Sequence, residues 1–366
     1  MNRRRAMGLI GATAMAGAAR PAWARETPDA VLDAVFEDDA PPALAAGIIG
    51  RDGLRWSGVR GVRRRGSADA ATLQDRWHLG SNTKAMTAAV YGRLVDRGLS
   101  RWNRPMTDIF PEITVHPAWM GVTVDQLMSH RAGLRDEDLL SREVLSAARG
   151  DARPLVEQRL DRVRAALTAA PGGTAGTFAY ANINFVLAGA AIERISGAPW
   201  EAAMQAELFG PLGISTGGFG APSGDQPWGH QTLGPVMTPL DPVLNPDNPP
   251  LMGPAGTAHM SLPDYARFLG LFLTRGGEVL TPATVERLTT PGVGAGRAYA
   301  LGWAVERMDW AAGPVLLHEG SNTLWHAIAV LDPAGGVGYL ALSNETSRGG
   351  PAIRAMVRRL SRPEPG

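Results

Sequence analysis

Strand-forming segments lie at both ends of this 366-residue chain, and a long helix-rich region separates them. Five short runs of apolar and β-branched residues are predicted to be strands: residues 44–49, 54–60, 315–318, 327–331 and 338–342. Arg51-Asp52-Gly53 turns the first run into the second, and residues 332–336 turn the fourth into the fifth. We therefore predict an α+β fold in which both chain ends build one antiparallel sheet flanked by helices.

Helical patterns flank these strands and dominate the middle of the chain. Thr27-Pro28-Asp29 supplies a cap and a first-turn proline for one helix, and residues 352–360 form a last amphipathic helix. Further helices are expected at residues 124–129, 141–149, 155–169, 185–196 and 200–209, and after Ser261.

The middle region shows no evident strand pairs. Residues 235–254 are rich in proline and are expected to be a long loop with polyproline II bias, of the kind that often forms a wall of a site. The predicted organisation is an α/β domain of residues 25–95 and 255–366, with a helical domain of residues 96–254 inserted in it.

The first 24 residues have the character of an export signal. Residues 2–7 are basic with adjacent arginines, residues 8–19 are mildly apolar but too short to span a bilayer, and Ala22-Trp23-Ala24 is an A-x-A cleavage site. The arginine pair resembles that of a twin-arginine signal. We expect cleavage after Ala24 and a periplasmic or secreted protein without a stable membrane anchor.

Charge and cysteine content argue against several classes of protein. The net charge is +1, and residues 1–24 carry four arginines and no acidic residue, so cleavage would leave −3. This balance argues against a nucleic-acid partner. The chain has no cysteine, so it has no disulfide, no thiolate metal site and no lipid-anchored N-terminal cysteine.

Ser81 and Lys84 stand at the start of a predicted helix that ends near Gly98. Residues three apart share a helix face, so a hydroxyl lies beside an amine, as a nucleophile beside a possible base. Lys84 is the only lysine, and the other 35 cationic residues are arginine. Arginine cannot lose its proton in a protein, whereas lysine can. The lone lysine therefore predicts a site that needs a neutral amine; the alternative is a surface lysine with a serine upstream by accident.

Tyr180-Ala181-Asn182 supplies a second candidate group on a turn before the helix expected at residues 185–196. A phenol near a cationic lysine would have a lowered pKa and could act as a general base. The asparagine amide could hold Lys84 and a substrate carbonyl. By itself, the tripeptide fits equally a packed tyrosine at a helix start with a capping asparagine.

His318-Glu319-Gly320-Ser321 ends the strand that begins at residue 315. Alternation puts His318 and Gly320 on one face and Glu319 on the other. Gly320 would let a substrate lie close to the backbone, and the N–H of Ser321 could face the site. The alternative is an edge-strand histidine before a turn. No second histidine follows at helical spacing, so this is not a zinc-protease motif, and we expect no metal.

In chain order, Ser-x-x-Lys, Tyr-x-Asn and His-x-Gly resemble the three motifs of the serine β-lactamase and penicillin-binding-protein-like superfamily. The closest patterns are those of class C β-lactamases and of the related esterases and peptidases. Four other segments also resemble family segments: residues 127–134, 207–214, 254–261 and 299–303. The resemblance covers roughly residues 28 to 360.

This resemblance implies a mechanism. Ser81 attacks a carbonyl and forms an acyl-enzyme that water hydrolyses, while Lys84 and Tyr180 share the proton transfers in an order the family leaves open. Asn182 orients Lys84 and the acyl group. The backbone N–H groups of Ser81 and Ser321 match the family's oxyanion hole, which the dipole of the helix after Ser81 supports. Neither a metal nor an organic cofactor is needed.

The third motif bears on the substrate. His318 stands where β-lactamases usually have a lysine, which in this family faces the substrate's carboxylate. A neutral histidine attracts an anion less, and Glu319 adds negative charge nearby, although alternation points it away. We therefore expect a carboxylesterase on small acyl esters, with a β-lactamase or D-amino-acid peptidase or amidase as the alternative. A penicillin-recognising sensor without turnover is a remote alternative, against which the complete Ser/Lys/Tyr/Asn set argues.

Gly213-Ile214-Ser215-Thr216-Gly217 fits G-x-S-x-G, the nucleophile elbow of α/β-hydrolases, and makes Ser215 a rival nucleophile. An elbow needs a strand before the serine and a helix after it. Here a predicted helix and Pro211 precede it, and the glycine-rich residues 217–222 cannot start a helix. We expect a turn.

Overall fold

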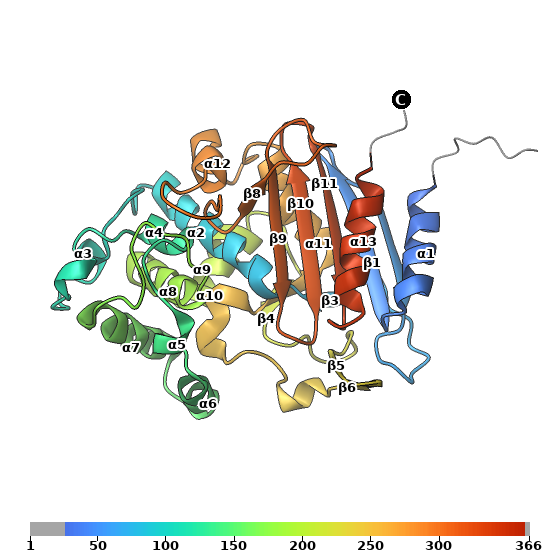
Figure 1. Cartoon of the computed structure of the whole chain (residues 1–366), viewed down its shortest axis with the longest axis horizontal. Helices are drawn as coiled ribbons and strands as arrows, with labels where there is room; N and C mark the ends of the chain where they lie inside the picture. Colours follow the sequence, from blue (N-terminus) through green and yellow to red (C-terminus); the bar gives the residue numbers. More distant parts are fainter. Residues whose placement is uncertain (1–25, 363–366) are drawn as a thin grey trace, which may run out of the picture.

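The computed structural model describes residues 26–362, so the predicted export signal lies outside the described residues. Figure 1 shows a sheet with helices on both faces, beside a helix-rich part. The sheet is antiparallel and six-stranded, in the order β2-β1-β11-β10-β9-β8. Its strands are β1 Ala43–Gly50, β2 Gly53–Gly61, β8 Ala304–Glu306, β9 Val315–Ser321, β10 His326–Asp332 and β11 Val337–Ser343.

The two chain ends meet in the middle of this sheet. β1 pairs with β11 along its whole length, from Leu44 opposite Ser343 to Gly50 opposite Val337. Each end also supplies a hairpin, because β1 continues into β2, and β10 turns into β11 at Asp332, which accepts the Gly335 amide. The predicted α+β fold with an antiparallel sheet is confirmed.

Helices cover both faces of the sheet. The terminal helices α1 Pro28–Asp39 and α13 Gly349–Leu360 pack together on one face over a small apolar core. Thr27 caps α1 as expected, by accepting the Ala30 amide. Helix α11 Leu262–Leu273 packs on the opposite face, in the main apolar core that continues into the helix-rich part. Burial on two faces explains why β10 is buried along its whole length.

The helix-rich part is built around α8 Ile183–Ser196, which is buried from Ile183 to Glu193. Around it lie α2 Thr83–Asp96, α3 Met106–Ile109, α4 Val124–Met128, α5 Asp136–Leu139, α6 Arg142–Gly150, α7 Leu155–Thr168, α9 Trp200–Met204 and α10 Gly253–Gly256, with α12 Pro282–Thr289 packed on α2. The predicted helices are present, and the one expected at residues 200–209 ends in a π-helical turn, Gln205–Phe209. The division into domains at residues 95 and 255 stays a prediction.

The expectation of no strand pairs in the middle region is wrong. β5 His230–Leu233 and β6 Val236–Pro239 form an antiparallel hairpin around Gly234, whose φ is +57°. The proline-rich composition masked this hairpin, since Pro239 is tolerated only because it sits at a strand end. A second small sheet joins β4 Gly218–Phe219, β7 Ala258–Ser261 and β3 Arg76–His78. A long irregular loop was predicted for residues 235–254. Only residues 240–252 are irregular, and they contain two short 3₁₀ turns.

Among residues 26–362, no helix has the length and apolarity of a bilayer span. The same residues contain no group of three or more His, Cys, Asp or Glu side chains arranged to hold a metal ion.

Candidate active site

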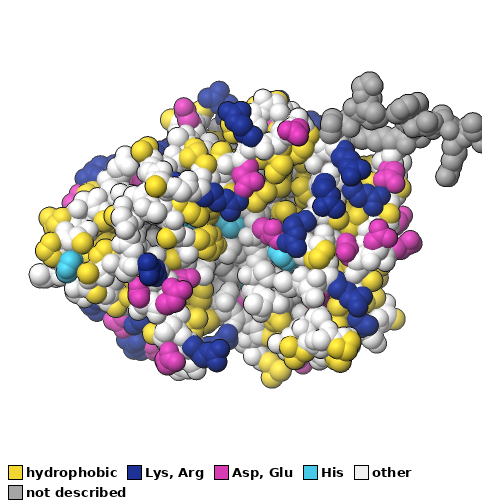
Figure 2. All heavy atoms as spheres, in the orientation of Figure 1, with side chains coloured by type: hydrophobic (Ala, Val, Ile, Leu, Met, Phe, Trp, Pro, Cys, Tyr) yellow, Lys and Arg dark blue, Asp and Glu magenta, His cyan; other side chains and the backbone are white. Residues whose placement is uncertain are grey.

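Ser81 lies in the 3₁₀ turn Gly80–Asn82, which leads directly into α2. Thr83 holds this turn to the neighbouring chain, because its hydroxyl donates to the Gly80 carbonyl at 2.7 Å and accepts the Ala258 amide at 3.0 Å. Figure 2 shows the surface hollowed where the helix-rich part meets the sheet, with histidine side chains visible in the hollow. The helix places the positive end of its dipole at Ser81.

The Lys84 side chain is completely buried in the first turn of α2. Its side-chain nitrogen contacts Ser81 Oγ at 2.9 Å, Asn182 Oδ1 at 2.8 Å and the Ala255 carbonyl at 2.7 Å. All three oxygens are neutral, and because the oxygens of Asn182 and Ala255 can only accept, an uncharged amine would donate to both and turn its lone pair to the Ser81 hydroxyl. The structure therefore brings the lone lysine against the predicted nucleophile and excludes a surface role for it.

Tyr180 and Asn182 approach the same amine from the start of α8. The Tyr180 ring is 45% exposed, and its centroid lies 4.9 Å from Lys84 Nζ. Asn182 does not cap α8 with its side chain; the Ile183 amide donates instead to Asp136 Oδ1 at 2.9 Å. The other Asp136 oxygen accepts Asn182 Nδ2 at 2.9 Å, which orients the amide with its oxygen toward Lys84. Asp136 carries no sequence signal for this role.

His318 is buried in β9 and is held as a neutral ring. Its Nδ1 donates to the Glu319 carbonyl (3.1 Å), so Nε2 accepts the hydroxyl of Tyr299 (3.0 Å). Burial, and then the positive charge of Lys84, lower the pKa of His318 to about 3. Burial also raises the pKa of Tyr299 well above 10, which keeps the phenol a donor. The third motif thus presents no cation to the site.

His130 is a neighbour of the site to which sequence reasoning assigned no role. It is buried, and its ring centroid lies 4.3 Å from that of Tyr180 and 4.9 Å from that of Tyr299. Its Nδ1 accepts the Ala181 amide at 3.3 Å. Burial, and then Lys84, lower the pKa of His130 well below 6.5. The only signal was that His130 and Tyr299 fall in segments that resemble family segments.

Two glycines let β9 approach the nucleophile turn. A Cβ on Gly320 would lie 2.5 Å from the Ser81 nitrogen, and a Cβ on Gly80 would lie 2.4 Å from the Ser321 nitrogen. Gly320 thus makes room for the backbone of the nucleophile turn, and the closeness of substrate expected from sequence stays a prediction. The N–H-bearing backbones of Ser81 and Ser321 are thereby brought next to each other. The Ser321 hydroxyl is used elsewhere, since it donates to the Trp325 carbonyl at 2.8 Å.

Glu319 and Ser215 take no part in the contacts around Lys84. Glu319 points to the opposite face of the sheet, where it pairs with His326 at 2.7 Å and with Arg354 of α13, so its charge does not face the site. Ser215 lies in an exposed turn between non-strand and non-helical residues, and its amide donates to Asp264 at 2.9 Å. It is not a nucleophile elbow.

The titration of His318 predicts a pH effect on stability. The unfolded histidine has a pKa near 6.5 and the folded one near 3, so the unfolded chain binds the extra proton between these values. The free energy of unfolding should therefore decrease as the pH is lowered through this window, by up to about 1.4 kcal/mol per pH unit from this residue. His318→Gln, which retains an acceptor for Tyr299, should show a shallower loss of unfolding free energy in urea between pH 6.5 and pH 4.5. Parallel curves for the two proteins would contradict the assignment.

A serine on a helix N-terminus, a buried lysine and an adjacent asparagine, set at the edge of an antiparallel sheet, define a serine hydrolase. The β-lactamase family model ("Beta-lactamase") matches residues 29–361, and the chain belongs to this family.

Curated relatives are distant. The chain is 25% identical to penicillin-binding protein 4 of Amycolatopsis lactamdurans over 86% of this chain and 83% of that protein. It is 25% identical to the unguisins hydrolase ungD' of Aspergillus campestris, over 68% of this chain but only 47% of that longer protein. It is 29% identical to the D-alanyl-D-alanine-carboxypeptidase/endopeptidase AmpH of Escherichia coli, over 56% of this chain and 52% of that protein.

Solved structures share the fold. A penicillin-binding protein homologue from Pyrococcus abyssi superposes with a TM-score of 0.72 at 21% identity, covering 90% of this chain and 75% of that chain. A D-stereospecific amidohydrolase from Streptomyces superposes with a TM-score of 0.69 at 22% identity, covering 91% and 98%. These likenesses support the α+β architecture with its helical insert.

Proposed function

We propose that this serine hydrolase cleaves amide bonds of small peptides or aminoacyl amides through an acyl-enzyme on Ser81. The observation that carries the proposal is the Lys84 amine, held at 2.9 Å from Ser81 Oγ and at 2.8 Å from Asn182 Oδ1. A buried amine against a serine hydroxyl is the arrangement that activates a nucleophile.

The chemistry follows from the placement of these groups. Ser81 Oγ attacks the substrate carbonyl and loses its proton to Lys84 or Tyr180, which then protonates the leaving nitrogen. The N–H groups of Ser81 and Ser321 stabilise the oxyanion, aided by the dipole of α2. Water attacks the acyl-enzyme by the same route in reverse and releases the acid. Asn182, fixed by Asp136, holds the amine in line throughout.

The charge of the site supports uncharged substrates. His318 is neutral, Glu319 faces away, and Lys84 is enclosed by neutral oxygens. A substrate carboxylate would find no cation on the third motif, which disfavours anionic β-lactams. The relative named as a carboxypeptidase and endopeptidase favours amides over the esters expected from sequence alone. Small acyl esters remain the second candidate, because the same neutral third motif suits them.

A panel of four substrates tests the proposal: D-phenylalanine amide, D-alanyl-D-alanine, p-nitrophenyl butyrate and a chromogenic cephalosporin. We expect the amide to give a higher kcat/KM than the anionic dipeptide and the cephalosporin. Turnover of the ester without any amide would replace the proposal with the esterase, and a preference for the cephalosporin would overturn both.

The nucleophile is tested separately with a fluorophosphonate. The wild-type protein should be labelled once per chain at Ser81, and Ser81→Ala should abolish both the label and the activity. Ser215→Ala is the matched control and should leave both unchanged. The Ser215 amide donates to Asp264, whereas Lys84 contacts Ser81. An adduct on Ser215 would contradict the assignment.

A further inference from the structure

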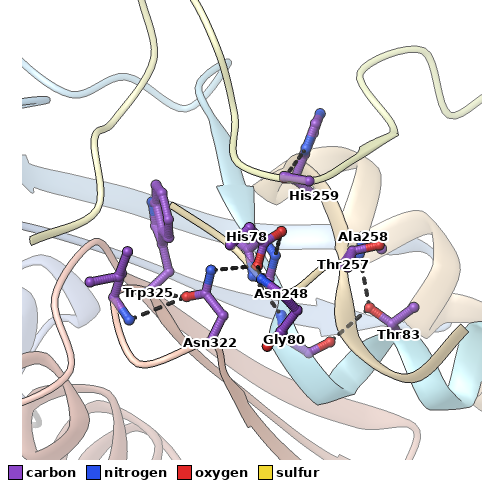
Figure 3. A network of polar contacts seen from close by, with 12 residues as sticks. His78, Gly80, Thr83, Asn248, Thr257, Ala258, His259, Asn322 and Trp325 are labelled. Carbon is purple, nitrogen blue, oxygen red and sulfur yellow. Dashed lines mark hydrogen bonds and ion pairs between the residues drawn. The ribbon is translucent and has the colours of Figure 1, made fainter. Parts of the chain in front are cut away.

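Asp247 is a buried carboxylate on the irregular segment 240–252, and its side chain is completely shielded from solvent. Its Oδ2 accepts His78 Nε2 at 2.9 Å, while its Oδ1 accepts Asn322 Nδ2 at 2.8 Å and the Asn248 amide at 2.7 Å. Among residues 26–362, no lysine or arginine side chain forms an ion pair with it. Figure 3 shows His78 and Asn322, which come from separate segments, close to Asn248, the residue that follows Asp247.

The hydrogen bonds of His78 determine its tautomer. The Gly80 amide can only donate, and it donates to His78 Nδ1 at 3.1 Å, so the ring proton is on Nε2 and points at Asp247. The ring is also stacked on Trp325, with centroids 5.7 Å apart, so packing and two hydrogen bonds together orient it. Asp247 therefore fixes His78, and His78 fixes the amide of Gly80, which precedes the nucleophile Ser81.

Asn322 links the Asp247 carboxylate to the other side of the site. Its Oδ1 accepts the amides of Leu324 at 3.2 Å and Trp325 at 3.1 Å, so its Nδ2 must face Asp247. Asn322 directly follows Ser321, at the turn between β9 and β10. The Asp247 carboxylate thus connects Gly80, which precedes the proposed oxyanion donor Ser81, to Asn322, which follows the other proposed donor, Ser321.

We propose that Asp247 is a positioning residue that holds the two halves of the oxyanion hole in register, through His78 on one side and Asn322 on the other. The inference rests on the proposed function of Ser81 and Ser321. An oxyanion hole works only if its two N–H groups keep their spacing, since they must lie about 2.7–3.1 Å from the developing charge. Here the donors come from segments roughly 240 residues apart. Packing at Gly80 and Gly320 brings these segments together, and the hydrogen bonds of Asp247 add a directional constraint on their spacing.

Asp247→Asn tests the bridge with almost no change of shape. His78 and Asn322 donate to different oxygens of Asp247, and an amide has an acceptor oxygen on one side only, so the variant cannot accept from both. If its NH₂ faces His78, the ring must take the other tautomer, and its Nδ1–H then opposes the Gly80 N–H. We expect kcat for D-phenylalanine amide to fall about 10²-fold, as when one oxyanion donor is weakened, with KM within about twofold. Affinity for phenylboronic acid, whose serine adduct is tetrahedral, should fall in parallel.

A reciprocal change should restore the bridge. In the double variant Asp247→Asn/Asn322→Asp, the carboxylate moves to position 322. One of its oxygens accepts from Leu324 and Trp325, and the other accepts the new amide at position 247, whose oxygen then faces His78. The kcat and the boronate affinity of the double variant should be at least about tenfold higher than those of Asp247→Asn. The deficit that remains relative to wild type is attributed to the lost Asn248 contact.

Asp332→Asn is the matched control for simple loss of stability. Asp332 is also buried and accepts two backbone amides, Ala312 at 2.7 Å and Gly335 at 2.9 Å, but it lies at the end of β10 away from Asn322. It should keep wild-type kcat and boronate affinity. If Asp247→Asn does not fold, His78→Phe replaces it: this change keeps a ring against Trp325, removes the acceptor for Gly80 together with the donor to Asp247, and should give the same fall in kcat.

Three results would overturn the inference. The first is a folded Asp247→Asn variant with kcat and boronate affinity within twofold of wild type. The second is a double variant no better than the single one, and the third is a rise in KM that accounts for the whole loss. Failure of the proposed function looks different: the wild type would then hydrolyse neither amide nor ester, and labelling would survive Ser81→Ala. That result would overturn both proposals.

Discussion

Lys84→Arg should lower kcat/KM for any acyl substrate by about 10³-fold or more, although it keeps the positive charge. The Lys84 amine is enclosed by Ser81, Asn182 and the Ala255 carbonyl at 2.7–2.9 Å. A guanidinium is larger than this enclosure and cannot give up its proton, so it can neither fit nor act as a base. The measurement is steady-state hydrolysis of the best substrate, with circular dichroism to show that the variant is folded.

The matched control is Arg93→Lys on the same helix. Arg93 is partly exposed and lies near Glu207, so exchanging one cation for another there should leave kcat/KM within about twofold. If Lys84→Arg also retained activity within tenfold, a fixed positive charge would suffice at this position. The argument that the only lysine marks a site where a proton must be lost would then be wrong.

Arg159→Met should destabilise the protein by about 3–5 kcal/mol, the usual cost of removing one partner of a buried ion pair. The Arg159 guanidinium is fully buried in the helix-rich part and donates to Glu193 and Glu201, each at 2.5 Å, and to the carbonyls of Pro250 and Leu251. It therefore joins α7, α8, α9 and the segment before α10. Methionine fills the volume but leaves the Glu193 carboxylate buried without a countercharge. Urea unfolding followed by tryptophan fluorescence measures the loss.

This loss should depend on pH with a defined sign. Burial already raises the pKa of Glu193, and Arg159 is the main group that lowers it, so removing Arg159 raises the pKa further. A folded-state pKa above the unfolded value destabilises the fold at neutral pH, and the penalty is relieved as pH falls and the carboxyl is protonated. The deficit of Arg159→Met should thus be smaller at pH 5 than at pH 7. Arg153→Met, which removes an exposed pair, should show neither the loss nor the pH effect. An equal deficit at both pH values would refute the unpaired carboxylate as its cause.

The parts of the site that could be predicted are those that depend on the spacing of residues close together in the sequence. Ser81 and Lys84 share a helix face because they are three apart, and Glu319 points away from His318 because strands alternate. Both relations depend only on local backbone geometry, which the residues themselves determine. The five strands of the main sheet were predictable for the same reason, since their alternation and turns are local. The short strand β8, at the edge of the sheet, has no such signal.

The misses have a common physical cause. Asp136, His130 and Tyr299 lie far along the chain from Ser81, and no short-range spacing to Ser81 or Lys84 distinguishes them from other polar residues. The β5–β6 hairpin was hidden because Pro235 and Pro239 lie at positions where an edge hairpin happens to tolerate them. Gly320 was recognised as a place of close approach, but only packing shows that the approaching group is the turn that carries Ser81.

By itself, the sequence determined the fold class, the nucleophile with its lysine, and the order of the three motifs, because each depends on side-chain identity and on neighbours a few residues away. Only the tertiary structure decided that His318 is neutral, that Asn182 is aimed by Asp136, and that Asp247 connects Gly80 to Asn322. Burial and long-range hydrogen bonds exist only once distant segments pack together, and these set the charge and the geometry of the site.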